Sequence, residues 1–148
     1  MSATSNNEST VRAARILVVE DQELLATLIA DVLGDAHEVI CAPTAADATK
    51  RLLGGAIDLV LLDCVLPDGP NWQVVLEADR QEIPVVLMTG YSGEAKELAG
   101  GGRPYLLKPF NMAALIDIID SNLHALHRKQ RPSRRQSAGA RRILSKAT

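Results

Sequence analysis

The sequence has few of the features that characterise secreted or membrane-spanning proteins. Its 148 residues include only two cysteines, Cys41 and Cys64, which are too few for a disulfide framework. No apolar run approaches the roughly 20 residues that a membrane-spanning helix needs. The opening residues, MSATSNNEST, have neither the basic start nor the apolar segment of a secretory signal. We therefore expect a cytoplasmic protein whose cysteines behave as small hydrophobic side chains.

Length and composition favour one domain with polar ends. A chain of 148 residues with 47% hydrophobic residues can bury one sizeable core but is too short for two. Residues 1–14 and 129–148 are polar and contain little that can be buried. We expect a disordered N-terminal segment over residues 1–14, a domain over residues 15–128 and a disordered tail over residues 129–148.

The net charge of −2 hides an uneven distribution of charge along the chain. Residues 15–127 hold 17 acidic and 7 basic residues, whereas residues 128–148 hold 8 basic residues and no acidic one. A basic tail is most often a solvated extension, although its cations can bind phosphate backbones or an acidic surface. Because no nucleic-acid-binding motif accompanies the tail, we expect no specific nucleic-acid partner.

Within residues 15–128, short apolar runs alternate with helical patterns. The apolar runs lie at residues 15–20, 37–42, 57–63, 84–90 and 104–108, and the helical patterns lie at 21–34, 44–55, 71–80, 92–101 and 111–128. The runs are continuous in Val, Ile and Leu, which is typical of strands buried on both faces. Since a helix separates each strand from the next, the pattern predicts a doubly wound α/β fold with a parallel five-stranded sheet.

Residues at the helix ends agree with this pattern. Gly34 is placed for a left-handed cap at the end of the first helix. Thr44 with Asp47 resembles a capping box for the second helix. Asn71 and Asn111 are predicted to cap the third and fifth helices.

Polar side chains stand where four of the predicted strands end. Glu20 and Asp21 follow the first strand, Asp63 ends the third, Thr89 lies at the end of the fourth, and Lys108 ends the fifth. In an open parallel sheet, ligands bind at the carboxyl ends of the strands. The sequence therefore predicts three carboxylates, one hydroxyl and one ammonium at the same edge of the sheet.

This cluster predicts metal-assisted phosphoryl chemistry. Two carboxylates about 4 Å apart repel by roughly 4 kcal/mol at an effective dielectric constant near 20, and a divalent cation removes that repulsion. Ligands that are all oxygen atoms favour Mg²⁺. With the ion bound, Asp63 can attack phosphorus and form an aspartyl phosphate. Thr89 and Lys108 would share the negative charge of the phosphoryl oxygens.

Four stretches of the chain resemble the motifs of response regulator receiver domains. They are LVVEDQ (17–22), LVLLDCVLPDG (59–69), VVLMTGY (85–91) and YLLKPF (105–110), and they occur in the family's order. The resemblance implies a flavodoxin-like (βα)5 fold with strand order 2-1-3-4-5. It also implies that a histidine kinase or a His phosphotransfer protein donates the phosphoryl group. The protein would then be a signalling protein, limited to self-catalysed phosphoryl transfer and autodephosphorylation, and not an enzyme.

The resemblance also assigns roles to individual residues. It implies that Mg²⁺ is bound by Glu20, Asp21, Asp63 and the backbone carbonyl of Val65, and that Asp63 is the phosphoacceptor. Thr89 would be the switch hydroxyl and Tyr105 the aromatic side chain that rotates. Lys108 would be the phosphate-binding lysine, and it precedes a proline that is often cis in the family. Phosphorylation is implied to change the surface formed by the fourth helix, the fifth strand and the fifth helix, where a downstream protein docks. The protein is expected to be a monomer or to dimerise when phosphorylated.

The chain departs from the family pattern at several positions. Pro70 and Asn71 stand where the family commonly has an acidic or amide residue followed by glycine, and Gly90 replaces the usual alanine. Val65 and Tyr91 lie two residues beyond Asp63 and Thr89, at positions that influence how water reaches the phosphoryl group in this family. Our hypothesis is that this apolar and aromatic pair slows hydrolysis.

We expect a stand-alone receiver that works by protein contacts and has no attached output module. One alternative is a phosphatase with an aspartyl intermediate, similar to haloacid dehalogenases. Such enzymes usually have a second Asp two residues after the first, where this chain has Val65. Another alternative is a phosphorylation-independent interaction module that uses the basic tail.

Overall fold

The computed structural model describes residues 12–69, 71–90 and 102–130. Its elements are β1 (Arg15–Val19), α1 (Glu23–Leu33), β2 (Glu38–Ala42), α2 (Ala45–Leu53), β3 (Leu59–Asp63), α3 (Trp72–Arg80), β4 (Val85–Thr89), β5 (Tyr105–Leu107) and α5 (Met112–Gln130). The helix predicted over residues 92–101 lies outside the described residues. α5 ends two residues beyond the boundary expected at residue 128.

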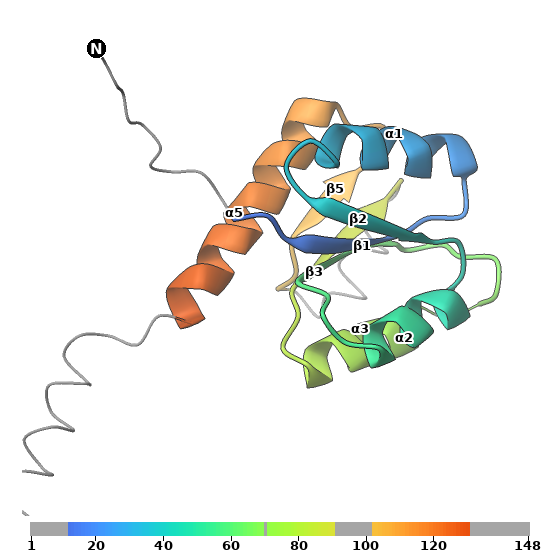
Figure 1. The fold of residues 1–148 in the computed structure, drawn as a ribbon. Coiled ribbons are helices and arrows are strands. Elements are labelled where there is room, and N and C mark those ends of the chain that lie inside the picture. The colour runs from blue at the N-terminus through green and yellow to red at the C-terminus, as the bar shows by residue number, and fades with distance from the viewer. Residues whose placement is uncertain (1–11, 70, 91–101, 131–148) are drawn as a thin grey trace, which may run out of the picture.

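The five strands form one parallel sheet in the order β2-β1-β3-β4-β5, which confirms the predicted fold class. α1 and α5 cover one face of the sheet, and α2 and α3 cover the other (Figure 1). This arrangement brings the carboxyl ends of β1, β3, β4 and β5 to the same edge. No helix in the described part of the chain is long and apolar enough to cross a membrane.

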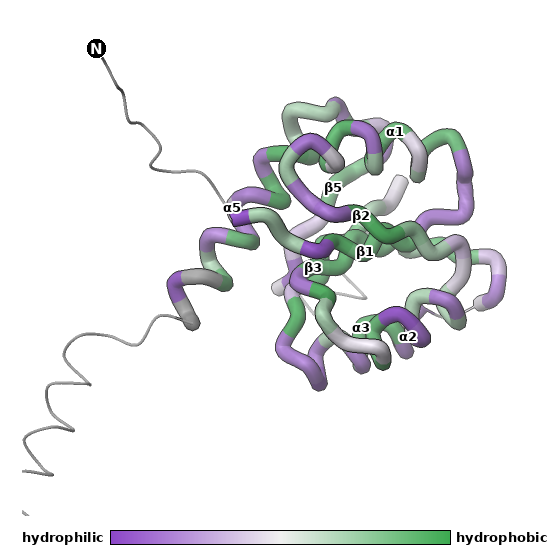
Figure 2. The backbone as a smooth tube through the Cα atoms, in the orientation of Figure 1, coloured by the Kyte–Doolittle hydropathy of each residue, from purple (hydrophilic) through white to green (hydrophobic). Residues whose placement is uncertain are grey.

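The core consists of two apolar layers, one on each face of the sheet. Along β3, Leu59 and Leu61 pack toward α1 and α5, whereas Val60 and Leu62 pack toward α2 and α3. All five residues of β3 are buried, and so are all five of β4. Figure 2 shows hydrophobic residues concentrated along the strands. Burial on both faces explains why these strands are continuous apolar runs instead of alternating patterns.

Two of the predicted helix caps are confirmed by hydrogen bonds. Thr44 Oγ1 accepts a hydrogen bond from the Asp47 N–H at 3.1 Å and so caps α2. Asn111 Oδ1 accepts one from the Ala114 N–H at 2.7 Å at the start of α5. These bonds satisfy N–H groups that have no partner within the helix.

The left-handed cap predicted at Gly34 is wrong. Gly34 has right-handed helical angles, φ −67° and ψ −16°, and its N–H donates to the Ala30 carbonyl oxygen at 2.8 Å. Glycine is needed here for space, because a Cβ at this position would lie 2.7 Å from that oxygen. The two cysteines are free thiols, and burial raises the pKa of the Cys41 thiol.

Replacing the two glycines that end α1 and α2 by alanine should have opposite effects. Gly54 is also right-handed (φ −71°, ψ −12°), but the nearest neighbour of a Cβ there would be the Arg51 carbonyl oxygen at 3.4 Å. Gly54→Ala should raise the free energy of unfolding by about 0.4–1 kcal/mol, because alanine restricts the unfolded chain. Gly34→Ala should lower it by about 1–3 kcal/mol, because the methyl group pushes against the Ala30 carbonyl. Urea unfolding measures both, and shifts of the same sign would contradict the prediction.

Candidate functional site

The carboxyl edge of the sheet holds a cluster of polar side chains. Glu20 directly follows β1 and is 2% exposed, and Asp63 is the last residue of β3 and is 5% exposed. Thr89 ends β4 and is buried, one residue beyond the register partner of Asp63. Lys108 follows β5. The strand ends predicted from the sequence therefore meet at one edge.

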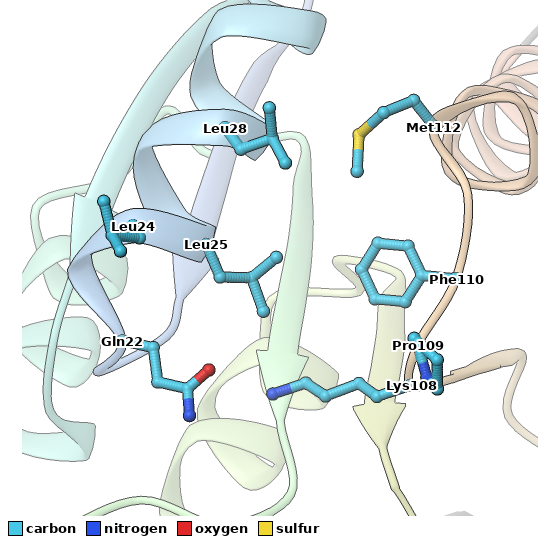
Figure 3. A pocket seen from close by; sticks show the side chains of 8 residues that line it. All are labelled: Gln22, Leu24, Leu25, Leu28, Lys108, Pro109, Phe110 and Met112. Atoms are coloured by element: carbon cyan, nitrogen blue, oxygen red, sulfur yellow. The ribbon is translucent and has the colours of Figure 1, made fainter.

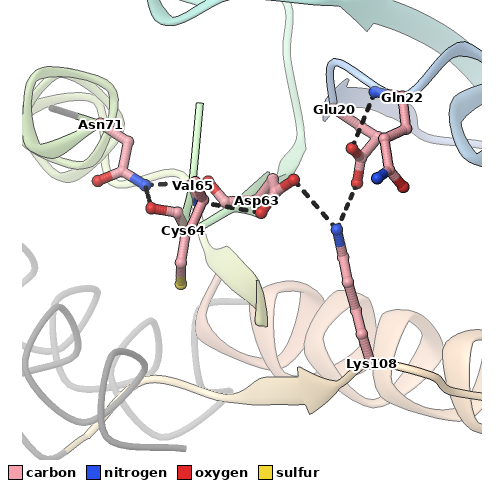
Figure 4. A network of polar contacts seen from close by, with 7 residues as sticks. All are labelled: Glu20, Gln22, Asp63, Cys64, Val65, Asn71 and Lys108. Carbon is pink, nitrogen blue, oxygen red and sulfur yellow. Dashed lines mark hydrogen bonds and ion pairs between the residues drawn. The ribbon is translucent and has the colours of Figure 1, made fainter. Parts of the chain in front are cut away.

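Lys108 connects the two buried carboxylates. Its Nζ lies 2.8 Å from Glu20 Oε1 and 3.1 Å from Asp63 Oδ2 (Figure 4). The remaining oxygen of each carboxylate accepts a backbone hydrogen bond at 3.0 Å: Glu20 Oε2 from the Gln22 N–H, and Asp63 Oδ1 from the Val65 N–H. All four carboxylate oxygens therefore have partners, which fixes the orientation of both groups.

Burial and the shared contacts with Lys108 shift the pKa values of the cluster. Burial raises the pKa of Glu20 above its ordinary value, the Asp63 carboxylate adds to this, and hydrogen bonds from Lys108 and Gln22 offset only part of it. Burial alone would lower the pKa of Lys108. Its hydrogen bonds and ion pairs with Glu20 and Asp63 outweigh burial, so the pKa of Lys108 is raised. Lys108 therefore stays protonated and forms ion pairs with both carboxylates.

The same carboxylates form a group suited to a divalent metal ion. Ligand oxygens of Glu20, Asp21 and Asp63 all lie within 4.8 Å of one another, with Asp21 exposed and the other two buried. An all-oxygen donor set with an open side is suited to Mg²⁺, which usually keeps several water ligands. The donors therefore fit the predicted ion. The backbone carbonyl of Val65 as a further ligand stays a prediction.

The side chain of Asn71 has a different role from the one predicted. Asn71 precedes α3, but its side chain makes no capping hydrogen bond. Its Nδ2 instead donates to the backbone carbonyl oxygens of Asp63 at 2.9 Å and Cys64 at 2.7 Å. The predicted cap is therefore wrong, because the amide is turned back onto the loop after β3. The one signal in the sequence was the departure from glycine at this position.

Asp68 is a second residue of this loop whose role was not predicted. Its carboxylate accepts hydrogen bonds from the backbone N–H groups of Ala45 at 2.9 Å and Ala46 at 3.0 Å, in the first turn of α2. These bonds lower the pKa of Asp68. They attach the loop that follows Asp63 to a neighbouring helix, and a negative charge at a helix N-terminus is favourable.

Of the remaining predicted residues, the structure describes Val65 and Tyr105. The side chain of Val65 is 63% exposed and that of Tyr105 is 36% exposed. The Lys108–Pro109 peptide bond is cis, as the resemblance implied. Tyr91 lies outside the described residues.

An apolar groove adjoins the cluster on the side of α1 (Figure 3). It is lined by Gln22, Leu24, Leu25, Leu28, Lys108, Pro109, Phe110 and Met112. Leu24 is 89% exposed and Leu28 is 48% exposed. An apolar surface therefore lies directly beside the Lys108 side chain.

Comparisons with known proteins agree with the fold. Residues 16–120 match the model of the response regulator receiver domain. Transcriptional regulatory protein TcrA of Mycobacterium tuberculosis is 34% identical over 125 residues, covering 80% of this chain and 48% of TcrA. Transcriptional regulatory protein AruR of Pseudomonas aeruginosa is 31% identical over 140 residues, covering 88% of this chain and 56% of AruR. The chain thus spans about half the length of these two relatives.

A solved structure shows the same architecture. The crystal structure of a response regulator receiver protein from Sinorhizobium medicae has a TM-score of 0.71 and 28% sequence identity, and the match covers 76% of this chain and 96% of that one.

Removing the Lys108 cation should destabilise the metal-free protein. Lys108→Gln should lower the free energy of unfolding by about 2 kcal/mol, because two buried carboxylates lose their shared partner while some exposure of Lys108 softens the loss. Lys50→Gln, at an exposed position on α2, should change it by less than about 0.5 kcal/mol. Adding Mg²⁺ should restore part of the loss, since an ion that binds only the folded state stabilises it. Thermal unfolding with and without Mg²⁺ measures this, and equal effects of both variants would contradict it.

Proposed function

The chain belongs to the response regulator receiver domain family, and we propose that Asp63 is its phosphoacceptor. The donor would be a phosphohistidine on a histidine kinase or a His phosphotransfer protein. The observation that carries this proposal is the position of the Asp63 carboxylate, held between Lys108 Nζ and the Val65 N–H beside two further carboxylates. Receiver domains are phosphoacceptors and not classical enzymes.

The residues of the site have different proposed roles in phosphoryl transfer. An Asp63 carboxylate oxygen attacks phosphorus, a P–O bond forms, and the P–N bond breaks with its electron pair going to the imidazole. Lys108 carries positive charge next to Asp63 Oδ2 and can stabilise charge on a phosphoryl oxygen. Bound Mg²⁺, for which Glu20, Asp21 and Asp63 are the proposed ligands, supplies further positive charge to those oxygens. The Thr89 hydroxyl is the proposed hydrogen-bond donor that moves toward the new phosphoryl group.

The geometry of the edge also suggests how a donor protein approaches. Asp63 ends β3 at the carboxyl edge of the sheet, and the apolar groove beside Lys108 lies next to that edge. A donor protein that delivers its phosphoryl group there would cover Leu24 and Leu28, which are exposed in the structure. Burial of these side chains would contribute to docking.

The proposed output is a change of surface driven by added charge. Phosphorylation adds about two negative charges at a strand end, which biases a two-state element. Exposed apolar side chains lie on β5 and α5, namely Tyr105, Leu107 and Ile116, and they are the proposed contacts of a downstream protein. The fourth helix of this surface lies outside the described residues. Monomeric or phosphorylation-dependent dimeric behaviour, cytoplasmic location and action without an attached output module stay predictions.

The alternatives have weaker support. A phosphatase of the haloacid dehalogenase type would need a carboxylate at the position of Val65, where the chain has an exposed valine. An interaction module that works through the basic tail depends on residues 129–148, of which residues 131–148 lie outside the described residues.

The first test is phosphorylation by a small donor. After incubation with Mg²⁺ and acetyl phosphate, the wild-type protein should gain the mass of one phosphoryl group and Asp63→Asn should gain none. Asp58→Asn is the matched control, because Asp58 lies at the opposite end of the sheet, where its Oδ2 accepts from the Arg15 N–H. It should be modified like the wild type. Absence of both an adduct and beryllofluoride binding in the wild type would refute the proposal.

The exposed valine beside Asp63 should lengthen the life of the phosphoryl group. Val65→Asn should shorten that lifetime several-fold, and the double change with Tyr91→Ala should shorten it further, because a polar side chain admits and orients water. Leu53→Asn is the control, since Leu53 on α2 is exposed to the same 63% as Val65. Loss of phosphoprotein is followed by mass spectrometry after the donor is removed. A lifetime unchanged in both Val65 variants would contradict the hypothesis.

A further inference from the structure

We propose that Asn71 is a positioning residue for phosphoryl transfer: its side-chain amide orients the peptide between Cys64 and Val65 and, through that peptide, the Asp63 carboxylate. The proposal rests on the proposed function of Asp63. It concerns a position at which this chain departs from the glycine common in its family, so it describes a feature of this chain.

Asn71 is buried and makes all its observed side-chain hydrogen bonds to the loop that follows β3. It is 5% exposed, and its Nδ2 donates to the consecutive carbonyl oxygens of Asp63 and Cys64. The residue itself is anchored, because its own carbonyl oxygen accepts from the Val74 N–H at 3.1 Å and the Val75 N–H at 3.3 Å in α3. One amide group therefore joins the first turn of α3 to the phosphoacceptor segment.

The peptide between Cys64 and Val65 is held at both ends (Figure 4). Its carbonyl oxygen accepts from Asn71 Nδ2 at 2.7 Å, and its N–H donates to Asp63 Oδ1 at 3.0 Å. In a planar trans peptide the C=O and N–H point in opposite directions, so an amide that fixes the carbonyl also directs the N–H. Asn71 thereby aims the Val65 N–H at the phosphoacceptor.

The aimed N–H determines how the Asp63 carboxylate is presented. Asp63 Oδ1 faces the Val65 N–H, and Oδ2 faces Lys108 Nζ at 3.1 Å. With one oxygen held from each side, the carboxylate has little freedom to rotate. Reaction at phosphorus depends on such pre-organisation, since small misplacements of a reacting group reduce the rate strongly.

The effect of Asn71 is separable from helix stability. Its side chain does not cap α3, so the helix does not depend on that amide. In Asn71→Asp the shape of the side chain is kept, but an oxygen replaces the NH₂ group and faces two carbonyl oxygens. The peptide then loses its anchor and the Val65 N–H is no longer directed at Asp63.

The experiment compares Asn71→Asp with Asn122→Asp in the full chain. Asn122 is a matched control, because its Nδ2 also donates to a backbone carbonyl, that of Ile118 at 2.7 Å, but on α5. Three quantities are measured: hydrogen exchange of the Val65 amide, Mg²⁺ affinity by NMR titration, and the rate of phosphorylation by acetyl phosphate. Asn71→Asp should show faster Val65 exchange and roughly tenfold losses in Mg²⁺ affinity and phosphorylation rate, as for other residues that orient metal ligands. Asn122→Asp should leave all three at wild-type values.

The outcomes separate this proposal from the proposed function. If the wild type accepts neither a phosphoryl group nor beryllofluoride, the function fails, and Val65 exchange still decides whether Asn71 orients the peptide. If Asn71→Asp is folded and its Val65 exchange, Mg²⁺ affinity and phosphorylation rate stay within twofold of wild type, the positioning role is overturned. Asn71→Ala, which removes the amide without adding a charge, gives the same test should Asn71→Asp not fold.

Discussion

The site depends on one electrostatic constraint: three carboxylates at one edge of a sheet need positive charge close to them. Lys108 supplies the only side-chain cation bonded to these carboxylates in the described part of the chain, and it serves Glu20 and Asp63 at once. Because Lys108 follows β5 while the carboxylates follow β1 and end β3, this contact requires the three strands to end at the same edge of the sheet, as they do in the observed strand order. The raised pKa of Glu20 indicates that one ammonium does not fully compensate the burial. A bound divalent ion would add the positive charge that Lys108 alone does not supply to these carboxylates.

A second constraint acts on the loop after β3, whose backbone is held by polar contacts beside Asp63. Asp68 binds the first turn of α2 through two backbone N–H groups, and Asn71 binds the carbonyls of Asp63 and Cys64. Asp68 thus bonds to the backbone of α2, and Asn71 bonds to the backbone at the end of β3 and in the loop that follows it. The loop is thus attached by polar contacts to a helix on one side and to its own strand on the other, in addition to the burial of Leu66 in the core.

The parallel α/β fold and the polar side chains at the strand ends could be predicted from the pattern of burial, whereas the strand order came from the family resemblance. Strands covered on both faces must be continuous apolar runs, and a charge after such a run must stand at the strand end, as Asp63 does. The roles of Asn71 and Gly34 could not be predicted in this way. The amide of Asn71 has an equally good local partner in a helix cap, and only the conformation of the loop decides between them. Gly34 is needed because of its 2.7 Å approach to a carbonyl oxygen, a distance that no sequence pattern encodes.

The contacts of Lys108 also suggest how a change of charge at Asp63 would affect the other strands at this edge of the sheet. The proposed phosphorylation of Asp63 would convert a carboxylate that pairs with Lys108 into an acyl phosphate and place the negative charge further out, on the phosphoryl oxygens. Lys108 would then be drawn between the unchanged carboxylate of Glu20 and the new charge. Its backbone N–H donates to the Thr89 carbonyl oxygen at 2.7 Å, so a shift of Lys108 acts directly on the end of β4. Since β4 and β5 pair over Leu87–Thr89 and Tyr105–Leu107, the strand that carries the exposed Tyr105 is coupled to the same movement. Under the proposed function, a redistribution of charge around one lysine would therefore link Asp63 to the outer strand of the sheet.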